Sequence, residues 1–378
     1  MPFDAGFKVS RRFVLSALAV PIATYAAPAR EGTLLVGQSA PLSGAMAPTM
    51  VGVLAGQQMA IDEANRSGGI HGRRLELVML DDGFDPARTL ENARTLVEQR
   101  QVVALFGSVG TTQTAALLPY VAEKKVPLIS AYTGSPALRT KHNPFFFTTQ
   151  ASYADELVRM VRNLKSVQST RIAVVYQNNE FGKLLLPVAE KVIAAEGCEV
   201  TVARPLEVSG GDAVAVAQAV AASRPQAVVM IVAGPAVVAY VKANRAHAGV
   251  PIYTFSLSVG SAILKALGED ARGLAVSRAT PYPWRATTAL ARTFAQQMAA
   301  AGKPVDYDHF AGYINGRVLV EGLRAAGKNP TPAGVAKAME KMGRLDLGGY
   351  AFEFSPENHH GSNFVEITVV GPNGNFMR

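Results

Sequence analysis

Cysteine is nearly absent from the 378-residue sequence, which contains only Cys198. A single cysteine cannot form an intrachain disulfide, so a disulfide framework is excluded as a source of stability. Cys198 is also far from the N-terminal region, which therefore has no cysteine that could carry a lipid anchor. Charged residues make up only 17% of the chain and hydrophobic residues 49%, which is enough apolar material for large cores. Length and composition predict a globular protein of two domains.

The short motifs of common enzyme classes are missing as well. The nearest approach to the G-x-S-x-G of serine hydrolases, at 37–41, fails at its last position. No lysine follows the small-residue loop 107–112 as in a P-loop, and no G-x-G-x-x-G follows the first predicted strand. No metal-ligand pattern includes any of the six histidines, which are His71, His142, His247, His309, His359 and His360. These absences predict that the protein is not an enzyme and uses no cofactor and no metal.

The N-terminal segment has the features of an export signal. Basic residues precede the apolar run 13–27, which is too short to span a bilayer comfortably but suits the hydrophobic part of a signal peptide. Small residues at 27–29 offer a cleavage site. The string at 10–15 resembles the twin-arginine signal, and an ordinary signal that happens to pair two arginines is the alternative. We expect residues 1–29 to be removed and the mature protein to be soluble in the periplasm.

The chain is basic without a nucleic-acid signature. Its formal net charge is +8, and removal of Lys8, Arg11, Arg12 and Asp4 with the signal leaves +6. Lysine and arginine do not cluster with aromatic residues in any segment. We therefore expect the positive charge to lie on solvated faces and expect no nucleic-acid partner.

Short apolar runs alternate with amphipathic stretches through the rest of the chain. Helix signals include Asp85 as an N-cap before Pro86, and the pair Gly68-Gly69 as a helix end. The runs are nearly continuous in Val, Ile and Leu, as in parallel strands covered by helices on both faces. This alternation predicts an α/β fold with doubly wound parallel sheets. The predicted strands are 102–106, 126–130, 171–176, 199–203, 227–232 and 252–255.

The stretch from Leu34 to Pro86 carries a family resemblance. It reads as the strand and loop LLVGQSAPLSG, a helix ending in IDEANRSGGIHGR, the strand LELVML and the acidic turn DDGFDP. In this order the segments closely resemble the start of the leucine/isoleucine/valine-binding protein family, which are type I periplasmic solute-binding proteins of ABC transporters. The resemblance extends over essentially all of the mature chain.

The resemblance implies two doubly wound lobes joined by a three-segment hinge. Lobe I is expected at 32–148 and 282–350, and lobe II at 149–281 and 351–378. Because each lobe is discontinuous in sequence, the crossings can act as a hinge that closes a central cleft. The crossings are expected near 148–149, 279–281 and 354–356.

Ligands of open α/β sheets bind at the carboxyl ends of the strands, which selects a set of loops. These are 39–47, 107–112, 131–135, 177–181, 233–235 and 256–260, and the segment 150–155 should face the same cleft. The candidate ligand-binding residues in them are Ser43, Met46, Ser108, Val109, Thr111, Thr112, Tyr132, Thr133, Gly134, Tyr153, Asp155, Phe181, Ala233 and Ser256.

Among these loops, 107–112 leads into a helix. The free N–H groups and the dipole at a helix N-terminus favour an anion such as a ligand carboxylate. Thr111 can alternatively cap its own helix, and the two uses can coexist. In the resembled family, the hydroxyl residue at the position of Thr111 binds the ligand carboxylate with help from the next strand's loop, here 132–134.

Other positions depart from the family pattern. An acidic side chain that pairs with the ligand ammonium in branched-chain amino-acid receptors is matched here by Ser256. The nearest other carboxylate is Asp155, which can instead face solvent from the first turn of its helix. Phe181 and Ala233 stand where the family has tyrosines, and Tyr153 where an acidic residue is usual. The predicted cleft is therefore less charged and more aromatic, with Met46 beside it, although each aromatic residue can also be ordinary core.

The sequence thus predicts a periplasmic substrate-binding protein of an ABC importer. Its expected ligand is a small carboxylate, either an amino acid or an aromatic or 2-oxo acid, and its expected partners are ABC permease subunits, with the protein itself a monomer. A ligand-sensing protein of the same fold that reports to a regulator is the alternative. An exported enzyme is a weaker alternative, because the motifs for cofactors and metals are missing.

Overall fold

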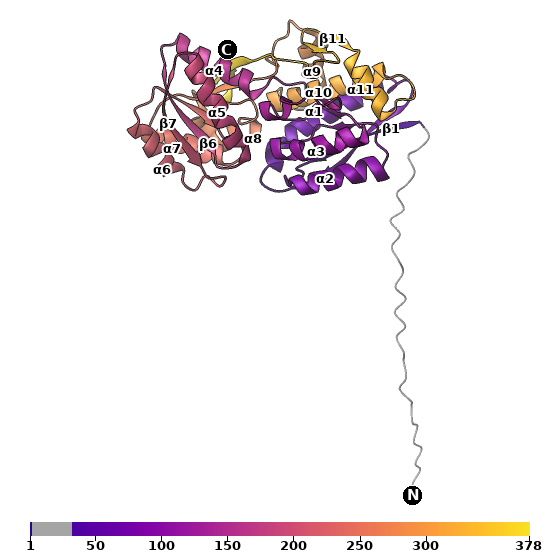
Figure 1. Cartoon of the computed structure of the whole chain (residues 1–378), viewed down its shortest axis with the longest axis horizontal. Helices are drawn as coiled ribbons and strands as arrows, with labels where there is room; N and C mark the ends of the chain where they lie inside the picture. Colours follow the sequence, from indigo (N-terminus) through magenta and orange to yellow (C-terminus); the bar gives the residue numbers. More distant parts are fainter. Residues whose placement is uncertain (2–31) are drawn as a thin grey trace.

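The computed structural model describes Met1 and residues 32–378. Apart from Met1, the predicted signal peptide at 1–29 lies outside these residues. The described chain forms two lobes side by side, and each lobe has a β-sheet covered by helices (Figure 1). No helix among the described residues combines the length and the apolar character needed to cross a membrane.

The first lobe is built on a five-stranded sheet in which neighbouring strands run parallel. Seven of the eight residues of its first strand are buried, as expected for a strand covered on both faces. The strands are β1 (Thr33–Ala40), β2 (Arg74–Asp81), β3 (Leu105–Phe106), β4 (Leu128–Ile129) and β5 (Phe146–Phe147), in the spatial order β2-β1-β3-β4-β5. The helices between them are α1 (Ala47–Arg66), α2 (Pro86–Arg94) with the π-helical turn Thr95–Gln99, and α3 (Thr111–Lys124).

A seven-stranded sheet forms the second lobe. Its strands are β6 (Arg171–Gln177), β7 (Glu199–Leu206), β8 (Ala227–Ile231), β9 (Ile252–Thr254), β10 (Ala275–Arg278), β13 (Glu366–Val370) and β14 (Phe376–Met377), in the order β14-β13-β10-β9-β8-β6-β7. The last two strands pair antiparallel, so this sheet is mixed rather than wholly parallel. Its helices are α4 (Tyr153–Ser166), α5 (Glu180–Ala195), α6 (Ala213–Ala222), α7 (Ala236–His247) and α8 (Ser261–Leu267).

The chain then returns to the first lobe. Helices α9 (Ala289–Ala300), α10 (Tyr307–Ala325) and α11 (Pro332–Glu340), with the hairpin β11 (Gly343–Asp346) and β12 (Ala351–Phe354), contribute side chains to the first lobe's core. Helix α10 packs closely on α1, because Gly56 and Gly312 have no side chains to separate the two backbones. Helix α10 therefore packs against a helix that ends more than 200 positions earlier in the sequence.

The predicted α/β fold with two parallel-sheet lobes is confirmed, and each of the six predicted strand runs contains a strand. The predicted lobe limits remain a proposal. The limit at residue 350 falls inside the β11–β12 hairpin, and Phe352 and Phe354 pack in the first lobe's core. The chain passes from that core to the second sheet between Phe354 and Glu366.

The segments that connect the lobes lie against one another. Thr148 follows β5, and its N–H donates to the carbonyl oxygen of His359 at 2.9 Å, while Gly361 N–H donates to the carbonyl oxygen of Thr148 at 2.9 Å. Tyr350 Oη donates to the carbonyl oxygen of Ala279 at 3.1 Å, which ties the second connection to the β11–β12 hairpin. These hydrogen bonds hold the segments that connect the lobes against one another.

His360 makes the stability of these connecting segments depend on pH. Its Nδ1 lies 3.0 Å from Thr148 Oγ1, and burial, with the nearby charge of Arg139, lowers its pKa to about 4. Since the folded-state pKa is below the unfolded value of about 6.5, stability is complete above pH 6.5 and is lost as the pH falls towards 4. We expect this loss to be about 1–2 kcal/mol after allowance for partial exposure.

Urea unfolding at pH 7.5 and pH 4.5 tests this expectation. His360→Asn should remove part of the acid-induced loss seen in the wild type, because asparagine keeps a polar contact to Thr148 but does not titrate. An unchanged difference between the two pH values in the variant would show that other groups cause the loss.

Candidate functional site

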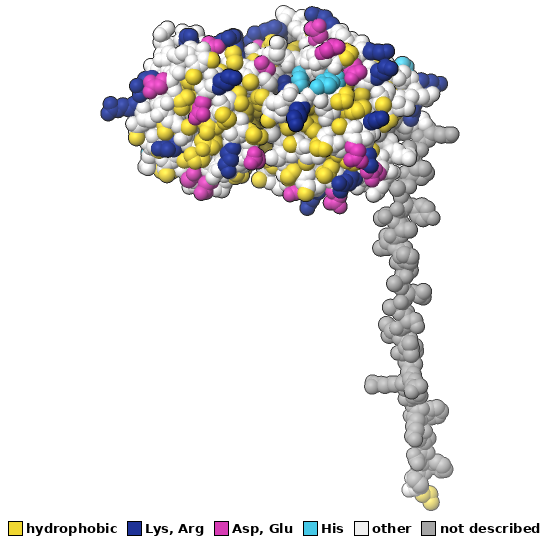
Figure 2. Space-filling model, viewed as in Figure 1, with side chains coloured by type: hydrophobic (Ala, Val, Ile, Leu, Met, Phe, Trp, Pro, Cys, Tyr) yellow, Lys and Arg dark blue, Asp and Glu magenta, His cyan; other side chains and the backbone are white. Residues whose placement is uncertain are grey.

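A cavity of about 780 Å³ lies between the two lobes. On the face shown in Figure 2, hydrophobic side chains lie on both sides of the junction between the lobes. The lining comes from loops at the carboxyl ends of strands in both sheets, the place where open α/β sheets bind ligands. It includes Ala45, Met46, Thr49, Met50, Gly83, Phe84, Val109, Gly110, Thr111, Thr112, Gln113, Tyr132, Tyr153, Gln177, Asn179, Glu180, Phe181, Val208, Ser209, Ala233, Pro235, Leu257, Gly260 and Asp308.

The N-terminus of α3 opens into this cavity. Its N-cap is Gly110, whose φ of 98° is in the left-handed region and which has no side chain to cap the helix. Thr111 does not cap the helix either, and its Oγ1 lies 3.1 Å from Thr133 Oγ1. The first turn of α3 therefore combines backbone N–H groups without a side-chain cap and a hydroxyl group at the cavity wall. This arrangement suits an anionic group such as a carboxylate.

Aromatic side chains form another part of the cavity wall. Tyr153 is 3% exposed, and its ring packs edge-on against Phe181 at 5.6 Å and Phe255 at 5.4 Å between ring centroids. Burial raises the pKa of Tyr153 to about 12, so its phenol stays protonated and can both donate and accept a hydrogen bond. Burial also raises the pKa of Tyr132. The wall thus offers an apolar surface with two neutral hydroxyl groups.

Met46 brings the two lobes together at the cavity. It precedes α1 in the first lobe, and a Cβ added to Gly234 of the second lobe would lie 3.1 Å from its sulfur. Gly234 has a φ of 71°, so a side chain at this position would be strained as well as crowded. A flexible thioether against a bare backbone allows close contact between the lobes here.

The structure brings eight of the predicted site residues into the cavity lining and leaves the other six outside it. The eight are Met46, Val109, Thr111, Thr112, Tyr132, Tyr153, Phe181 and Ala233. Behind the lining, Thr133 supports Thr111, Ser108 Oγ lies 3.0 Å from Thr114 Oγ1, and Gly134 leaves room for the Tyr153 ring. The others outside the lining are Ser43, Asp155 and Ser256.

Local hydrogen bonds explain two of these positions. Ser43 Oγ donates to Asp81 Oδ2 at 2.5 Å, which closes the turn after β1. Asp155 accepts from Ser152 N–H at 2.9 Å and from Ser152 Oγ at 2.7 Å, and forms a capping box at the start of α4. The Asp155 carboxylate is therefore used by its own helix, the structural role that acidic residues take in a first turn.

Ser256 lies next to a buried carboxylate that sequence reasoning missed. Glu156 accepts from Ser256 N–H at 2.9 Å, from Ser256 Oγ at 3.1 Å and from Ser277 Oγ at 2.5 Å. Burial raises the pKa of Glu156, while these hydrogen bonds and the charge of Arg278 act in the opposite direction. Both carboxylate oxygens are occupied, so Glu156 holds the loop after β9 in place and does not face the cavity.

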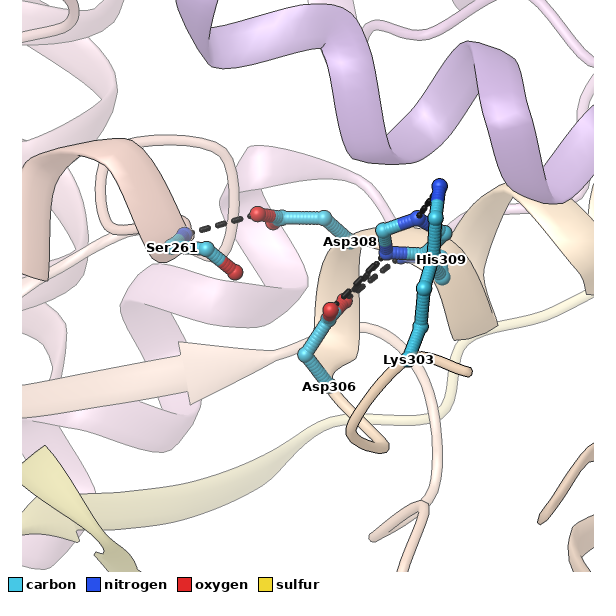
Figure 3. Close-up of polar contacts among 5 residues, drawn as sticks. All are labelled: Ser261, Lys303, Asp306, Asp308 and His309. Atoms are coloured by element: carbon cyan, nitrogen blue, oxygen red, sulfur yellow. Dashed lines mark hydrogen bonds and ion pairs between the residues drawn. The ribbon is translucent and has the colours of Figure 1, made fainter. Parts of the chain in front are cut away.

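Asp308 lines the cavity from the first lobe, and Glu180 is the carboxylate that lines it from the second lobe. Figure 3 shows Asp308 beside Ser261. Asp308 is in the first turn of α10, and its Oδ2 accepts from Ser261 N–H at the start of α8 at 2.7 Å. Burial raises the pKa of Asp308. Sequence reasoning also missed Phe84 and Gln113, whose side chains lie in the lining, with Gln113 Nε2 donating to the carbonyl oxygen of Phe84 at 2.7 Å. The only sequence feature that pointed to the region of Phe84 was the acidic turn at 81–86, which contains it.

The groups that line the cavity are suited to holding a small ligand. Within the described residues, no group of three or more His, Cys, Asp or Glu side chains is placed to hold a metal ion. The cavity offers a helix N-terminus, the carboxylates of Asp308 and Glu180, and aromatic side chains, which together can enclose a small ligand that has both an anionic and an apolar part.

Comparisons with known proteins agree with this geometry. A family model described as periplasmic binding protein matches residues 33–375. The leucine-, isoleucine-, valine-, threonine- and alanine-binding protein of Pseudomonas aeruginosa is 24% identical over 211 residues, which are 54% of this chain and 54% of that protein. The chemotactic signal transduction system substrate-binding protein BasB of Halobacterium salinarum is 28% identical over 173 residues, 43% of this chain and 41% of that protein. The aligned part thus spans about half the length of these curated relatives.

Solved structures resemble nearly the whole chain. A substrate-binding periplasmic protein from Ralstonia solanacearum is 28% identical with a TM-score of 0.83, over 91% of this chain and 99% of that one. A possible leucine/isoleucine/valine-binding protein from Rhodopirellula baltica is 25% identical with a TM-score of 0.85, over 93% of this chain and 98% of that one. The family model and these structures show that the chain belongs to the periplasmic binding proteins, as a type I member of the leucine/isoleucine/valine-binding group.

Proposed function

We propose that this protein is the substrate-binding protein of an ABC importer and that it binds a small carboxylate-bearing solute between its lobes. The solute is an amino acid or an aromatic or 2-oxo acid. The observation that carries the proposal is the interlobe cavity, because the N-terminus of α3 and the Thr111 hydroxyl face it beside an aromatic wall. Water excluded around the carboxylate and apolar surface buried at the wall would supply the affinity.

Binding requires the lobes to move. Asp308 contacts Ser261 and Met46 lies against Gly234, and each of these pairs joins the two lobes beside the cavity. The contacts must separate for a ligand to enter and can form again around it. The hinge segments at Thr148 and His360 are the places for this motion, since they connect the lobes.

The ABC permease is the proposed partner, and the mature protein is proposed to act as a soluble periplasmic monomer without covalent chemistry. The similarity to BasB, a substrate-binding protein of a chemotactic system, favours sensing as the second candidate function. A strain that lacks the gene separates the two. Loss of ligand uptake would support transport, whereas loss of the behavioural response with normal uptake would support sensing.

Thermal stability of the mature protein, stripped by unfolding and refolding, tests ligand binding. Exclusive binding to the native state adds about 4 kcal/mol at a thousandfold excess over the dissociation constant. We expect the melting temperature to rise with at least one member of a panel of branched-chain and aromatic amino acids, their 2-oxo acids and aryl carboxylates. The methyl esters of the same compounds are the matched controls and should have much smaller effects. Equal stabilisation by esters and acids would contradict a carboxylate site.

A further inference from the structure

Asp308 lies between the lobes, in a space left open by two glycines, Gly52 and Gly260. A Cβ added to Gly260 of the second lobe would lie 2.6 Å from Asp308 Oδ1 and 2.7 Å from Oδ2. A Cβ added to Gly52 of α1 would lie 2.6 Å from the Cβ of Asp308. Only residues without a side chain fit at these two positions while the carboxylate is in place. This space is enclosed only when the lobes are in contact, because Gly52 and Gly260 come from different lobes.

The two carboxylate oxygens of Asp308 differ in their partners. Oδ2 accepts from Ser261 N–H at 2.7 Å (Figure 3), and the Ser261 hydroxyl also acts against burial to lower the pKa of this carboxyl, whereas no donor lies at hydrogen-bond distance from Oδ1 within the described part of the chain. Asp308 also lines both the main cavity and a smaller adjoining cavity that Tyr132 shares. One oxygen thus joins the lobes, and the other is available to a ligand.

No cation forms an ion pair with this carboxylate at contact distance, and the positive charge that acts on it is that of Arg278, which lines the same smaller cavity and acts against burial to lower the pKa of Asp308. Among the described residues, no Lys, Arg or His nitrogen lies within 4.0 Å of Asp308. His309 pairs with Asp306 at 2.8 Å, and Lys303 lies beside His309 rather than Asp308. The buried Arg278 donates to the carbonyl oxygen of Val259 at 3.1 Å. A carboxylate taken out of water gains from each further donor, so a ligand group that donates to Oδ1 would stabilise it beyond what Ser261 and the more distant Arg278 supply.

We propose that Asp308 is a specificity-determining residue, which accepts a hydrogen bond from an ammonium or hydroxyl group of the ligand and makes lobe closure depend on that donor. This inference rests on the proposed function and adds a second requirement for the ligand besides its carboxylate. Glu156 cannot take this role, because Ser256 and Ser277 occupy both of its oxygens.

Matched ligand pairs and one isosteric variant test the proposal. The pairs are leucine with 4-methylpentanoate, which lacks the ammonium group, and 4-hydroxybenzoate with benzoate, which lacks the hydroxyl group. The wild type should bind the donor-bearing member of one pair more tightly, and the pair that responds identifies the donor. Asp308→Asn should weaken binding of that member about 10- to 100-fold, the value of a charge-assisted hydrogen bond, and should not weaken binding of its donor-free analogue. Equal affinity of wild type and variant for the donor-bearing ligand would overturn the proposal.

Binding can be followed by the fluorescence of Trp284, the only tryptophan. Its ring packs edge-on against Tyr307, the neighbour of Asp308, with 5.5 Å between ring centroids. The signal therefore reports from the same end of α10. Calorimetry gives the affinities independently of this signal.

Small-angle scattering of the ligand-free protein tests the same residue without any ligand. Asp308→Asn keeps an oxygen for Ser261 N–H and removes the charge, so the variant should be more closed, with a smaller radius of gyration than the wild type. The Gly260→Ala variant should be more open, because its added methyl group would occupy the space of the Asp308 carboxylate. If no carboxylate stabilises the wild type, the proposed function is wrong, and the scattering still decides the role of Asp308. Identical radii of gyration in the wild type and both variants would contradict the proposed role of Asp308 in lobe closure.

Discussion

Replacing Gly312 by alanine is expected to lower the free energy of unfolding by about 2–3 kcal/mol, even though alanine has the higher helix propensity. A Cβ at this position would overlap the carbonyl oxygen of Val53 in α1. Backbone cannot rotate away as a side chain can, so α1 and α10 would have to separate. Because this contact joins residues 47–66 to residues 307–325, the loss affects the whole first lobe. Urea unfolding monitored by circular dichroism measures the change.

Gly322→Ala is the matched control in the same helix. Its added Cβ would meet the sulfur of Met339 at 2.5 Å, and this flexible side chain can move. The gain in helix propensity is the same for both variants, so the difference between them isolates the cost of the backbone contact. Equal stability of the two variants would mean that the α1–α10 contact adapts without cost.

Thr111→Val is expected to weaken carboxylate binding about 10- to 100-fold with little change in protein stability. Valine has the shape of threonine but cannot donate to an anion at the N-terminus of α3. It also leaves Thr133 with the N–H of Ser135 as a partner, at 3.3 Å. Thr111→Ser should retain most of the affinity, because it keeps the hydroxyl group. Calorimetry with the best ligand of the thermal-shift panel gives both values.

Thr112→Val is the control for this prediction. Thr112 Oγ1 donates to Gln113 Oε1 at 2.9 Å, so its hydroxyl hydrogen is already used. Its loss should change the affinity much less than the loss of the Thr111 hydroxyl. If both valine variants bind the ligand like the wild type, the carboxylate does not bind at this helix.

Local sequence signals were sufficient for strands β1–β4 and β6–β9, whereas β5 and β10–β14 were not predicted. Continuous apolar runs such as 227–232 can be buried on both faces only in a sheet that helices cover, and the structure has β8 there. Asp85 caps α2 through Arg88 N–H, as its position before Pro86 predicts. The return of α10 to the first lobe had no local signal, because it depends on glycines in two helices far apart in the sequence.

The candidate site was predictable to the extent that it lies on strand ends. Thr111, Tyr132, Tyr153 and Phe181 were found because each follows a strand or the first hinge crossing, and the structure places them in one cavity lining. Asp308 was missed because it lies on a helix near the return to the first lobe and follows no strand of either sheet. Ser256 offers no negative charge to pair with a ligand ammonium group. Only the structure shows a carboxylate on the other lobe of the cavity, that of Asp308.

The sequence by itself determined the alternation of strands and helices, the loops at strand ends and the family resemblance, because these depend on periodicity and on residues adjacent in the chain. The tertiary structure alone decided which carboxylates are available to a ligand. Asp155 is used by its own helix, Glu156 by two serines, and Asp308 keeps one oxygen free between the lobes. The physical reason is that the role of a carboxylate depends on which donors surround it, and the donors to Glu156 and Asp308 come from distant segments of the chain.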